Sequence, residues 1–411
     1  FQPDHAIRDC LLSRGLGDVY KRQIHSLADN KNIQYICNHN EQACAMAADG
    51  YSRVSGKTGV AVTTSGPGAT NLITGICCSY YDSIPSLFIT GQVSTMRMKG
   101  DTGVRQIGFQ ETPIVDIAEE ITKYAYTIVD PEEIKYQLQK ALHIAKSGRP
   151  GPVLIDIPDD LQRQLVDPLK LKNFQAPAAQ ELPHFKNSLQ DTMDSIMNSK
   201  RPILIAGWGV HLSDTEAEFL KFAESFNIPI ALTWGAADLI PFDHDLYVGT
   251  FGTHGNRHAN FAVQNADLII SLGSRLDTKS TGSPVNTFAR EAKKIMIDID
   301  INELNKFQYF DLKFDQLIHC DLKDFFNNFS KLEPTKDTNN NLEWLKQINK
   351  WKNQFTSFDD TKGIATTQGK ACGPIHVLKV LSQVGTMITQ GGKRDGAHMA
   401  IMEIYHPKSV G

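Results

Sequence analysis

The feature that most constrains the fold is an alternation of short apolar runs with helical patterns, which begins near residue 31. Near-continuous apolar strands that alternate with helices are typical of a parallel sheet covered on both faces. The segment 131–147 is amphipathic and has Pro131 in its first turn, where proline is favoured. We predict strands at 32–39, 58–65, 84–94 and 150–158, and helices at 41–56, 67–81 and 131–147.

A second series of the same kind follows a segment rich in proline and alanine. We predict strands at 201–210, 228–235, 265–277 and 293–300, and a helix at 213–226. The fold class is therefore α/β, with two doubly wound parallel-sheet domains. We expect the first domain at 24–165, a linker at 166–186, the second domain at 187–335, and a linker with an incomplete or aberrant tail at 336–411. Residues 1–23 match neither series, and we expect a non-native or disordered leader, with a polar N-terminal arm as the alternative.

Charge, hydropathy and cysteine usage exclude several classes of protein. The net charge of −4 gives no basic surface for nucleic acid or an anionic membrane. The apolar runs are shorter than the roughly 18 residues that a membrane span needs, and no secretory signal is visible. The seven cysteines form no CxxC pair, which is typical of reduced thiols and a cytoplasmic protein. The histidines of HGNRH (254–258) lie among glycines that disfavour a zinc-binding helix, and we assign no metal ligand in this chain.

An ionisable side chain opens the first predicted helix, in NEQACAMAADGYSR (40–53). Glu41 has two interpretations. It is a helix-start carboxylate favoured by the helix dipole, with the alanines serving tight packing. Alternatively, the small side chains of Ala43, Ala45 and Ala47 let a ligand pack close to the backbone, where Glu41 binds it, and burial against them disfavours the charged form of Glu41.

The second motif is TTSGPGATNLITG (63–75), which contains Gly66, Pro67, Gly68 and Asn71. Glycines between a strand and a helix let a ligand approach the backbone, and the helix N-terminus offers free N–H groups. The motif is neither a dinucleotide GxGxxG nor a P-loop. Taken alone, it is compatible with a generic α/β turn.

Taken together, these motifs resemble the pyrimidine-binding domain of thiamine-diphosphate enzymes, and the acetolactate synthase group most of all. The resemblance extends through DSIPSLFITGQV, GFQE and SGRPGPVLIDIP. LIAGWGV, PIALTWGAAD, GTHGNRHANFAVQNADLIISLGSRLD and IDIDINEL resemble, in order, the Rossmann-like central domain of that family. The whole resemblance covers about 24–335. Residues 24–165 correspond to the pyrimidine-binding domain, and 187–335 correspond to the central FAD/nucleotide-type domain.

The resemblance implies thiamine diphosphate as cofactor. Glu41 would hydrogen-bond the aminopyrimidine ring and help the cofactor lose its C2 proton. Gly66, Pro67 and Gly68 would let the backbone approach the ring, with Asn71 as a polar support. Gln110 would face the substrate, with Phe109 as an apolar wall; the alternative for Gln110 is a solvated residue at a helix start.

In the acetolactate synthase group the central domain also holds FAD, which does not act as a redox agent in the carboligation. An arginine at a strand end suits a pyrophosphate, and an aspartate that closes a strand suits a ribose hydroxyl. Arg275 also matches an arginine that binds the carboxylate of the second keto acid. The alternative is an empty scaffold, because relatives of this domain hold no flavin. The matching positions are Arg149, Gly207, Gly209, Thr233, His254, Gly255, Gly273, Arg275, Asp298 and Asp321.

The chain departs from the family pattern at single residues and in one larger feature. Asn40 stands where the group has histidine, Asp159 where it has lysine, and Leu276 and Lys279 where it has an aromatic residue and an arginine. The segment before FQE (96–108) is also longer than usual. The GDG…N motif that would hold Mg²⁺ and the diphosphate is missing. The tail offers only Asp395–Gly396, so we interpret the chain as a fragment that is inactive alone.

The intact protein is expected to decarboxylate pyruvate and join the two-carbon unit to a second 2-keto acid, in branched-chain amino acid biosynthesis. The resemblance implies a homodimer or tetramer with the active site between subunits, and a regulatory small subunit. It implies no nucleic-acid or membrane partner. Two alternatives stay open: a related 2-keto acid decarboxylase or carboligase of other substrate, and a non-catalytic binding module of the same fold.

Overall fold

The computed structural model describes residues 30, 33–177, 186–332 and 341–355, together with the pairs 364–365, 371–372, 389–390 and 394–395. The predicted leader 1–23 and nearly all of the predicted tail lie outside these ranges. Within them, no helix has the length and hydropathy that a membrane span requires.

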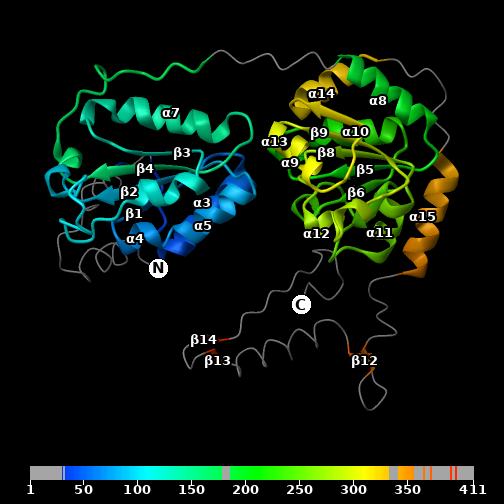
Figure 1. The fold of residues 1–411 in the computed structure, drawn as a ribbon, viewed down its shortest axis with the longest axis horizontal. Helices are drawn as coiled ribbons and strands as arrows, with labels where there is room; N and C mark the ends of the chain where they lie inside the picture. Colours follow the sequence, from blue (N-terminus) through cyan, green and yellow to red (C-terminus); the bar gives the residue numbers. More distant parts are fainter. Residues whose placement is uncertain are drawn as a thin grey trace.

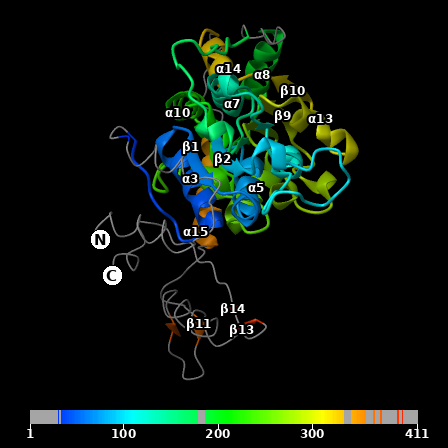
Figure 2. The same cartoon turned by 90° about the vertical axis from the view of Figure 1, so that its left-hand side faces the viewer.

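The first sheet has four parallel strands in the order β1-β2-β4-β3. Helices α3 (Glu41–Ser55) and α5 (Ile73–Tyr81) cover one face, and α7 (Ile134–Lys146) covers the other (Figure 1). α6 (Ile114–Ala118) packs on the α3 side. Figure 2 shows α3 and α5 next to β1 and β2 from a second direction. The strands are β1 (Gly59–Thr63), β2 (Ser86–Gln92), β3 (Tyr124–Thr127) and β4 (Val153–Pro158).

Helix α3 begins and ends where the sequence predicts. The side chain of Asn40 accepts a hydrogen bond from the backbone N–H of Gln42 at 2.8 Å and so caps the first turn. Gly56 ends the helix in the left-handed conformation, with φ of 66°. Small residues bring α3 and α5 together, because a Cβ on Gly75 would lie 2.3 Å from the Cβ of Ala45.

One strand prediction in this domain is wrong, and one strand was not predicted. The described residues of the predicted strand 32–39 pair with none of the four strands, and Ile36 is 85% exposed. An apolar run becomes a strand only where a neighbour accepts its backbone hydrogen bonds. β3 was not predicted, since its four residues are all half-buried and give no continuous apolar run. The stacked rings of Tyr124 and Tyr126, with centroids 6.0 Å apart, lie on this strand.

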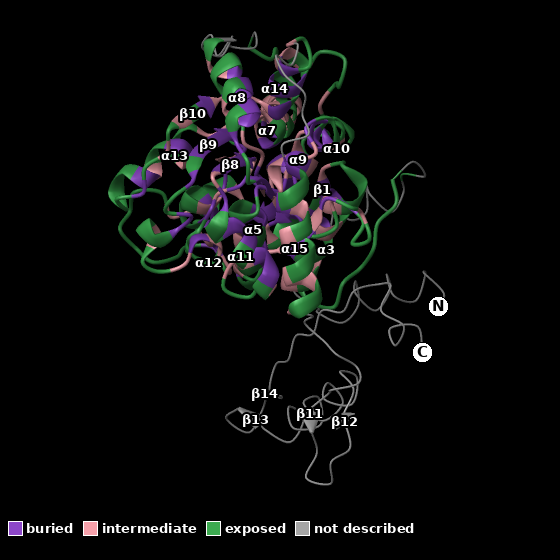
Figure 3. Ribbon diagram, turned by 90° about the vertical axis from the view of Figure 1, so that its right-hand side faces the viewer, coloured by how far each residue is buried: buried purple, intermediate pink, exposed green. Residues whose placement is uncertain are grey.

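The second sheet has six parallel strands in the order β10-β9-β8-β5-β6-β7. Helices α8 (Lys186–Asn198), α10 (Glu216–Ser225) and α14 (Leu322–Phe329) pack on one face. α11 (Arg257–Asn265), α13 (Ile301–Asn305) and α15 (Leu342–Gln354) pack on the other, so the strands are largely buried (Figure 3). The strands are β5 (Pro202–Ala206), β6 (Ile230–Leu232), β7 (Tyr247–Thr250), β8 (Leu268–Leu272), β9 (Lys293–Asp298) and β10 (Gln316–His319).

The remaining described elements are short. They are the helices α4 (Pro67–Thr70), α9 (Gly209–Leu212) and α12 (Thr278–Thr281), the 3₁₀ turns η1 (Thr95–Arg97), η2 (Glu119–Ile121), η3 (Pro131–Glu133), η4 (Leu161–Arg163), η5 (Trp234–Ala236), η6 (Val285–Thr287) and η7 (Lys306–Tyr309), and the two-residue strands β11 to β14 in the described pairs.

Helix α15 lies within the stretch predicted as a linker, yet it packs on the second sheet. Trp344 is buried, and its indole N–H donates to the carbonyl of Pro202 at 3.1 Å. Just before the helix, the amide of Asn341 donates to the carbonyl of Phe226 at 3.1 Å. The polar composition of 336–355 hid the apolar face that Trp344 and Ile348 turn inward.

Charged side chains join the two domains. Arg149, which precedes β4, donates to Asp300 at 3.0 Å and to Glu303 at 2.7 Å, both beyond the end of β9. The guanidinium of Arg53 in α3 lies over the ring of Trp208, 5.7 Å from its centroid. Figure 1 accordingly shows α9 and α13 on the side of the second domain that faces the first.

Candidate functional site

Two predicted site residues meet at the carboxyl end of β1. Asn71 follows α4, the short helix after that strand, and its side-chain amide donates to Glu41 Oε2 at 3.0 Å. Glu41 stands at the first position of α3, where the helix dipole favours a carboxylate. Residues 30 positions apart in the chain are thus brought into one polar pair.

The glycine turn and the GFQE segment also touch. Gly66 has φ of 59°, and a Cβ placed on it would lie 2.8 Å from the Cβ of Gln110. Gln110 itself has φ of 65°, which is unusual for a residue with a side chain. Phe109 beside it is 75% exposed. Gly68 has a packing reason of its own, since a Cβ there would lie 2.5 Å from Thr64 Cγ2.

The alanines of α3 are not the buried floor that the sequence predicts. Ala45 lies in the core, but Ala43 and Ala47 are exposed and Glu41 is only half-buried. Helical periodicity explains the difference, because residues two apart lie on different faces of a helix. The prediction that burial against all three alanines surrounds Glu41 is therefore wrong, because Ala43 and Ala47 lie on other, exposed faces of α3.

Two buried hydroxyl groups flank the same turn and were not predicted. Thr63 ends β1 and Ser65 precedes Gly66, and neither hydroxyl has a hydrogen-bond partner within the described part of the chain. Buried polar atoms without a partner are rare in native proteins and mark places where a ligand or water binds. A carboxylate, an amide and these hydroxyls form a donor and acceptor set that fits an aminopyrimidine ring.

A buried aspartate lies behind this site, at the centre of the first sheet. Asp156 in β4 accepts hydrogen bonds from the hydroxyl of Thr90 at 2.6 Å and from the side-chain amide of Gln92 at 3.0 Å. The same amide of Gln92 donates to the carbonyl of Thr112 at 2.8 Å. Burial raises the pKa of Asp156 to about 7. The single acid within the apolar run VLIDIP was the signal that could have identified this network.

The central-domain residues gather at one edge of the second sheet. Gly207 and Gly209 follow β5, while Gly273 follows β8. These two strands are neighbours in the sheet. After β5 the chain continues to β6 and β7 on one side, and after β8 it continues to β9 and β10 on the other. Such a switch point, at the carboxyl ends of parallel strands, is where open α/β sheets bind ligands.

Backbone packing accounts for these three glycines without a ligand. A Cβ on Gly207 would lie 2.2 Å from the carbonyl oxygen of Gly273, and one on Gly209 would lie 2.6 Å from the Cα of Gly273. The backbone N–H of Gly209 donates to the Gly273 carbonyl at 2.9 Å. Gly255, after β7, is crowded in the same way by Phe251, at 2.4 Å. The turns therefore require glycine for the fold itself.

Most other predicted cofactor residues have partners within the chain. Arg149 is bonded to Ser83, Asp300 and Glu303. Asp321 caps α14 by accepting from the N–H of Lys323 at 2.8 Å, and the hydroxyl of Thr233 donates to the carbonyl of Ala206 at 3.2 Å.

Three predicted residues remain along this edge. The exposed His254 ring lies 5.2 Å from that of Trp234. The carbonyl of Arg275 accepts a hydrogen bond from Lys306. Burial raises the pKa of Asp298, at the end of β9, to about 6.

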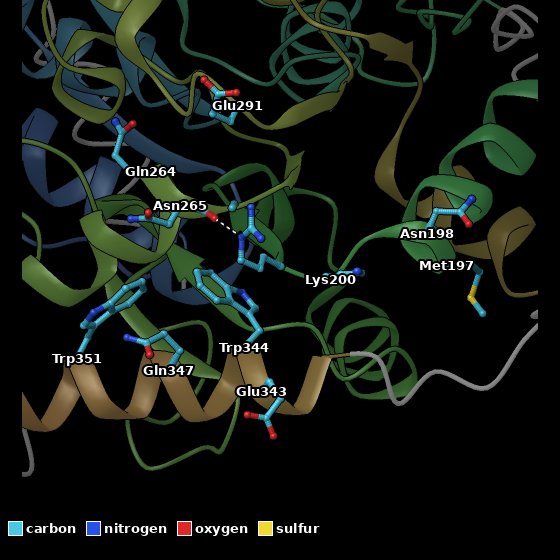
Figure 4. Close-up of a pocket in the computed structure, with 12 residues that line it drawn as sticks. Met197, Asn198, Lys200, Gln264, Asn265, Glu291, Glu343, Trp344, Gln347 and Trp351 are labelled. Atoms are coloured by element: carbon cyan, nitrogen blue, oxygen red, sulfur yellow. Dashed lines mark hydrogen bonds between the residues drawn. The ribbon is translucent and has the colours of Figure 1, made fainter.

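A cavity of about 720 Å³ lies at the opposite, amino edge of the second sheet and contains none of the predicted site residues (Figure 4). Its wall includes Trp344 and Trp351 of α15, together with residues that precede β5 and β8. Its best-placed donors are already used: Trp344 bonds to Pro202, and Arg201 donates to the carbonyl of Asn265 at 2.7 Å, the dashed line in Figure 4. This cavity gathers no free converging groups, and we place the candidate site at Glu41 instead. Among the described residues, no three His, Cys, Asp or Glu side chains could hold a metal ion.

Comparison with known proteins gives matches along most of the chain. Residues 16–118 match the family model described as thiamine pyrophosphate enzyme, N-terminal TPP binding domain, and residues 189–327 match the central domain of the same family. Residues 359–409 match a ribonucleotide reductase barrel domain, almost entirely outside the described residues.

The curated relatives include acetolactate synthases from three kinds of organism. A probable acetolactate synthase large subunit of Methanocaldococcus jannaschii is 38% identical over 338 residues, which cover 80% of this chain and 55% of that protein. The large subunit of Lactococcus lactis is 38% identical over 335 residues (79% and 55%), and the chloroplastic enzyme of Arabidopsis thaliana is 35% identical over 371 residues (88% and 52%). The chain spans about half the length of these relatives. It belongs to the thiamine pyrophosphate enzyme family and carries that family's N-terminal and central domains.

Proposed function

We propose that the protein to which this chain belongs decarboxylates pyruvate and joins the two-carbon unit to a second 2-keto acid, with thiamine diphosphate as cofactor. The observation that carries the proposal is the Glu41–Asn71 pair at 3.0 Å beside the contact of Gly66 with Gln110. This geometry occurs in a chain whose relatives are named acetolactate synthases. A site held together from three separate segments is not explained by a helix-start carboxylate alone.

Each residue of the site has a definite task. Thiamine diphosphate, when bound, supplies the carbon nucleophile and the electron sink for decarboxylation. With the cofactor bound, Glu41 would hold and exchange a proton at a nitrogen of its pyrimidine ring, and Asn71 fixes the carboxylate by donating to Oε2. Gly66 lets the ring approach the backbone, and the Ser65 hydroxyl offers it a buried partner.

Substrate binding is assigned to two side chains from different domains. Gln110 lies against the Gly66 turn and presents an amide that suits a keto acid. Arg275, after β8, is proposed to bind the carboxylate of the second keto acid, because a guanidinium pairs with a carboxylate through two hydrogen bonds. A carboxylated acceptor favours carboligation over simple decarboxylation.

FAD, Mg²⁺ and the subunit partners are also proposals. FAD is supported by the switch point between β5 and β8, because open α/β sheets bind ligands at such a point. The internal bonds of Arg149 and Asp321 favour structural roles for these two residues. Mg²⁺ would be held by ligands outside the described residues. The names of the relatives as large subunits support a small-subunit partner. The half-buried Glu41, together with the exposed Ala43 and Ala47 of α3, supports an active site completed by a second subunit.

The test is product analysis of the purified full-length protein with pyruvate, thiamine diphosphate and Mg²⁺. Acetolactate, detected as acetoin after acid treatment, is the expected product, and Glu41→Gln is the matched inactive control. Acetaldehyde without acetolactate would replace the carboligase by a decarboxylase. Binding of thiamine diphosphate without any product would replace both by a non-catalytic module. A flavin absorption spectrum of the purified protein, present or absent, decides the FAD proposal.

A further inference from the structure

The carboxylate of Glu111 holds together the long segment that precedes it. Glu111 is 9% exposed, and its oxygens accept hydrogen bonds from the backbone N–H of Lys99 at 2.5 Å, Ile107 at 2.8 Å and Gly108 at 3.4 Å. In return, the side chain of Gln106 donates to the Glu111 carbonyl at 2.9 Å. One buried side chain thus anchors both ends of the segment 99–108.

The charge state of Glu111 suits this task. Burial raises the pKa of the carboxyl, but the backbone N–H bonds outweigh burial and hold its pKa below the ordinary value. The ionised carboxylate is an acceptor only, and bonds from N–H groups to a charged acceptor are stronger than neutral ones. The anchor is therefore present throughout the neutral pH range.

The residues on either side of Glu111 belong to the candidate site and to the sheet behind it. Gln110 precedes it with φ of 65° and lies against Gly66. Thr112 follows it, and its carbonyl accepts from Gln92, which is bonded to Asp156. A side chain in a left-handed backbone conformation persists only where its surroundings fix it. Glu111 and the bond to Thr112 fix Gln110 from both sides.

We propose that Glu111 is a positioning residue that holds Gln110 against the Gly66 turn by tying the segment 99–108 to its own carboxylate. The inference rests on the proposed function for the role of Gln110 toward substrate, whereas the anchoring itself is independent of that function. Glu111 does not touch the substrate in this proposal.

The first arm of the test measures anchoring in the 411-residue chain without any ligand. Glu111→Ala should raise amide hydrogen exchange in peptides from 97–112 by at least about tenfold, because the acceptor of three N–H groups is lost. Glu111→Gln keeps an acceptor oxygen and should give a smaller increase. Glu120→Ala, which removes an exposed carboxylate nearby, is the matched control and should change nothing. Unchanged exchange in Glu111→Ala, or an increase spread over the whole domain, would overturn the proposal.

The second arm separates positioning from general stability. In the full-length protein, supplied with pyruvate, thiamine diphosphate and Mg²⁺, Gln110→Ala and Glu111→Ala should each lower kcat by about tenfold to a hundredfold. The double variant should lose no more than Gln110→Ala alone, because one residue acts through the other. Additive losses would assign Glu111 a merely structural role and overturn the proposal. If the wild-type full-length protein turns over no pyruvate, the proposed function fails, while the exchange arm in the 411-residue chain still decides the anchoring.

Discussion

The carboxyl edges of the two sheets look alike in sequence and differ in structure. Each has a glycine turn after a buried strand, with acidic residues nearby. In the first sheet the polar groups come from separate segments, face one another at Glu41 and Asn71, and leave the Thr63 and Ser65 hydroxyls without a partner. In the second sheet the glycines pack on one another's backbone, and the charged side chains are bonded within the chain.

This difference shows what topology can and cannot establish. A parallel sheet brings every strand end to one edge, so position alone nominates many residues in both domains. Hydrogen bonding separates those whose atoms are already used from those that remain available. Buried polar atoms without a partner among the described residues occur at both edges: the Thr63 and Ser65 hydroxyls at the first, and the Trp208 indole N–H and the Ser271 hydroxyl at the second. The first edge carries the stronger case for a ligand site because Glu41 and Asn71, from separate segments, face each other there, and each prediction below tests one side of the comparison.

The largest effect is expected at the glycine contact of the second sheet. Gly207→Ala should lower the free energy of unfolding by about 3 kcal/mol or more, because its Cβ would lie 2.2 Å from the Gly273 carbonyl oxygen and backbone must move. Urea unfolding measures the loss. Gly50→Ala is the matched control: it lies inside α3 with no atom within 4 Å of the added Cβ, and it should stabilise by up to about 1 kcal/mol. A loss below about 1 kcal/mol for Gly207→Ala would show that the fold itself does not require glycine at this turn. The approach of a bound ligand would then be the remaining reason for glycine there.

The next largest effect is expected in the pH dependence of the free energy of unfolding, which we compare for the buried aspartates of the two sheets. Asp156 keeps its proton up to a pKa of about 7, whereas an unfolded aspartate releases it near pH 4. The folded chain therefore binds the extra proton in this window, and the free energy of unfolding falls as pH rises from about 4 to 7. Asp156→Asn should remove about 3 kcal/mol of this pH dependence between pH 4.5 and 7, at about 1.4 kcal/mol for each pH unit. Asp298→Asn, whose pKa of about 6 is raised less, should remove a smaller part. Urea midpoints between pH 4.5 and 7.5 measure both, and equal slopes in wild type and Asp156→Asn would contradict the assignment.

The sequence predicted the two parallel sheets because their strands are buried on both faces and form apolar runs. It missed β3 and α15, whose residues are half-buried or polar and whose stability comes from neighbours distant in the chain. At the site, the motifs nominated Glu41, Asn71, Gly66 and Gln110, and the structure brings them together as two contacts. Sequence could not reveal that Glu111 anchors a segment, because the partners of its carboxylate are backbone groups and carry no residue signature.

A smaller effect is expected where the two domains meet. Arg149→Met should lower the free energy of unfolding by about 1 kcal/mol, since its ion pairs with Asp300 and Glu303 are partly exposed and screened by solvent. The loss should shrink at high salt. Arg163→Met, which breaks an exposed pair with Asp159, is the control and should cost less than about 0.5 kcal/mol. If Arg149→Met instead left the free energy of unfolding unchanged and abolished flavin binding, Arg149 would be assigned to the cofactor site.

The smallest effect on stability should accompany the largest effect on chemistry, at Glu41. Glu41→Gln keeps an acceptor for Asn71 and should change the free energy of unfolding by less than about 0.5 kcal/mol. It should slow exchange of the C2 proton of bound thiamine diphosphate by at least about a hundredfold, as the loss of a general acid–base group does. NMR of the cofactor in D₂O measures the exchange, and Asn71→Ala should give an intermediate loss because the carboxylate is no longer held. A stability loss near 1 kcal/mol with normal exchange would make Glu41 a helix-start residue stabilised by the dipole, and the first edge would then be as structural as the second.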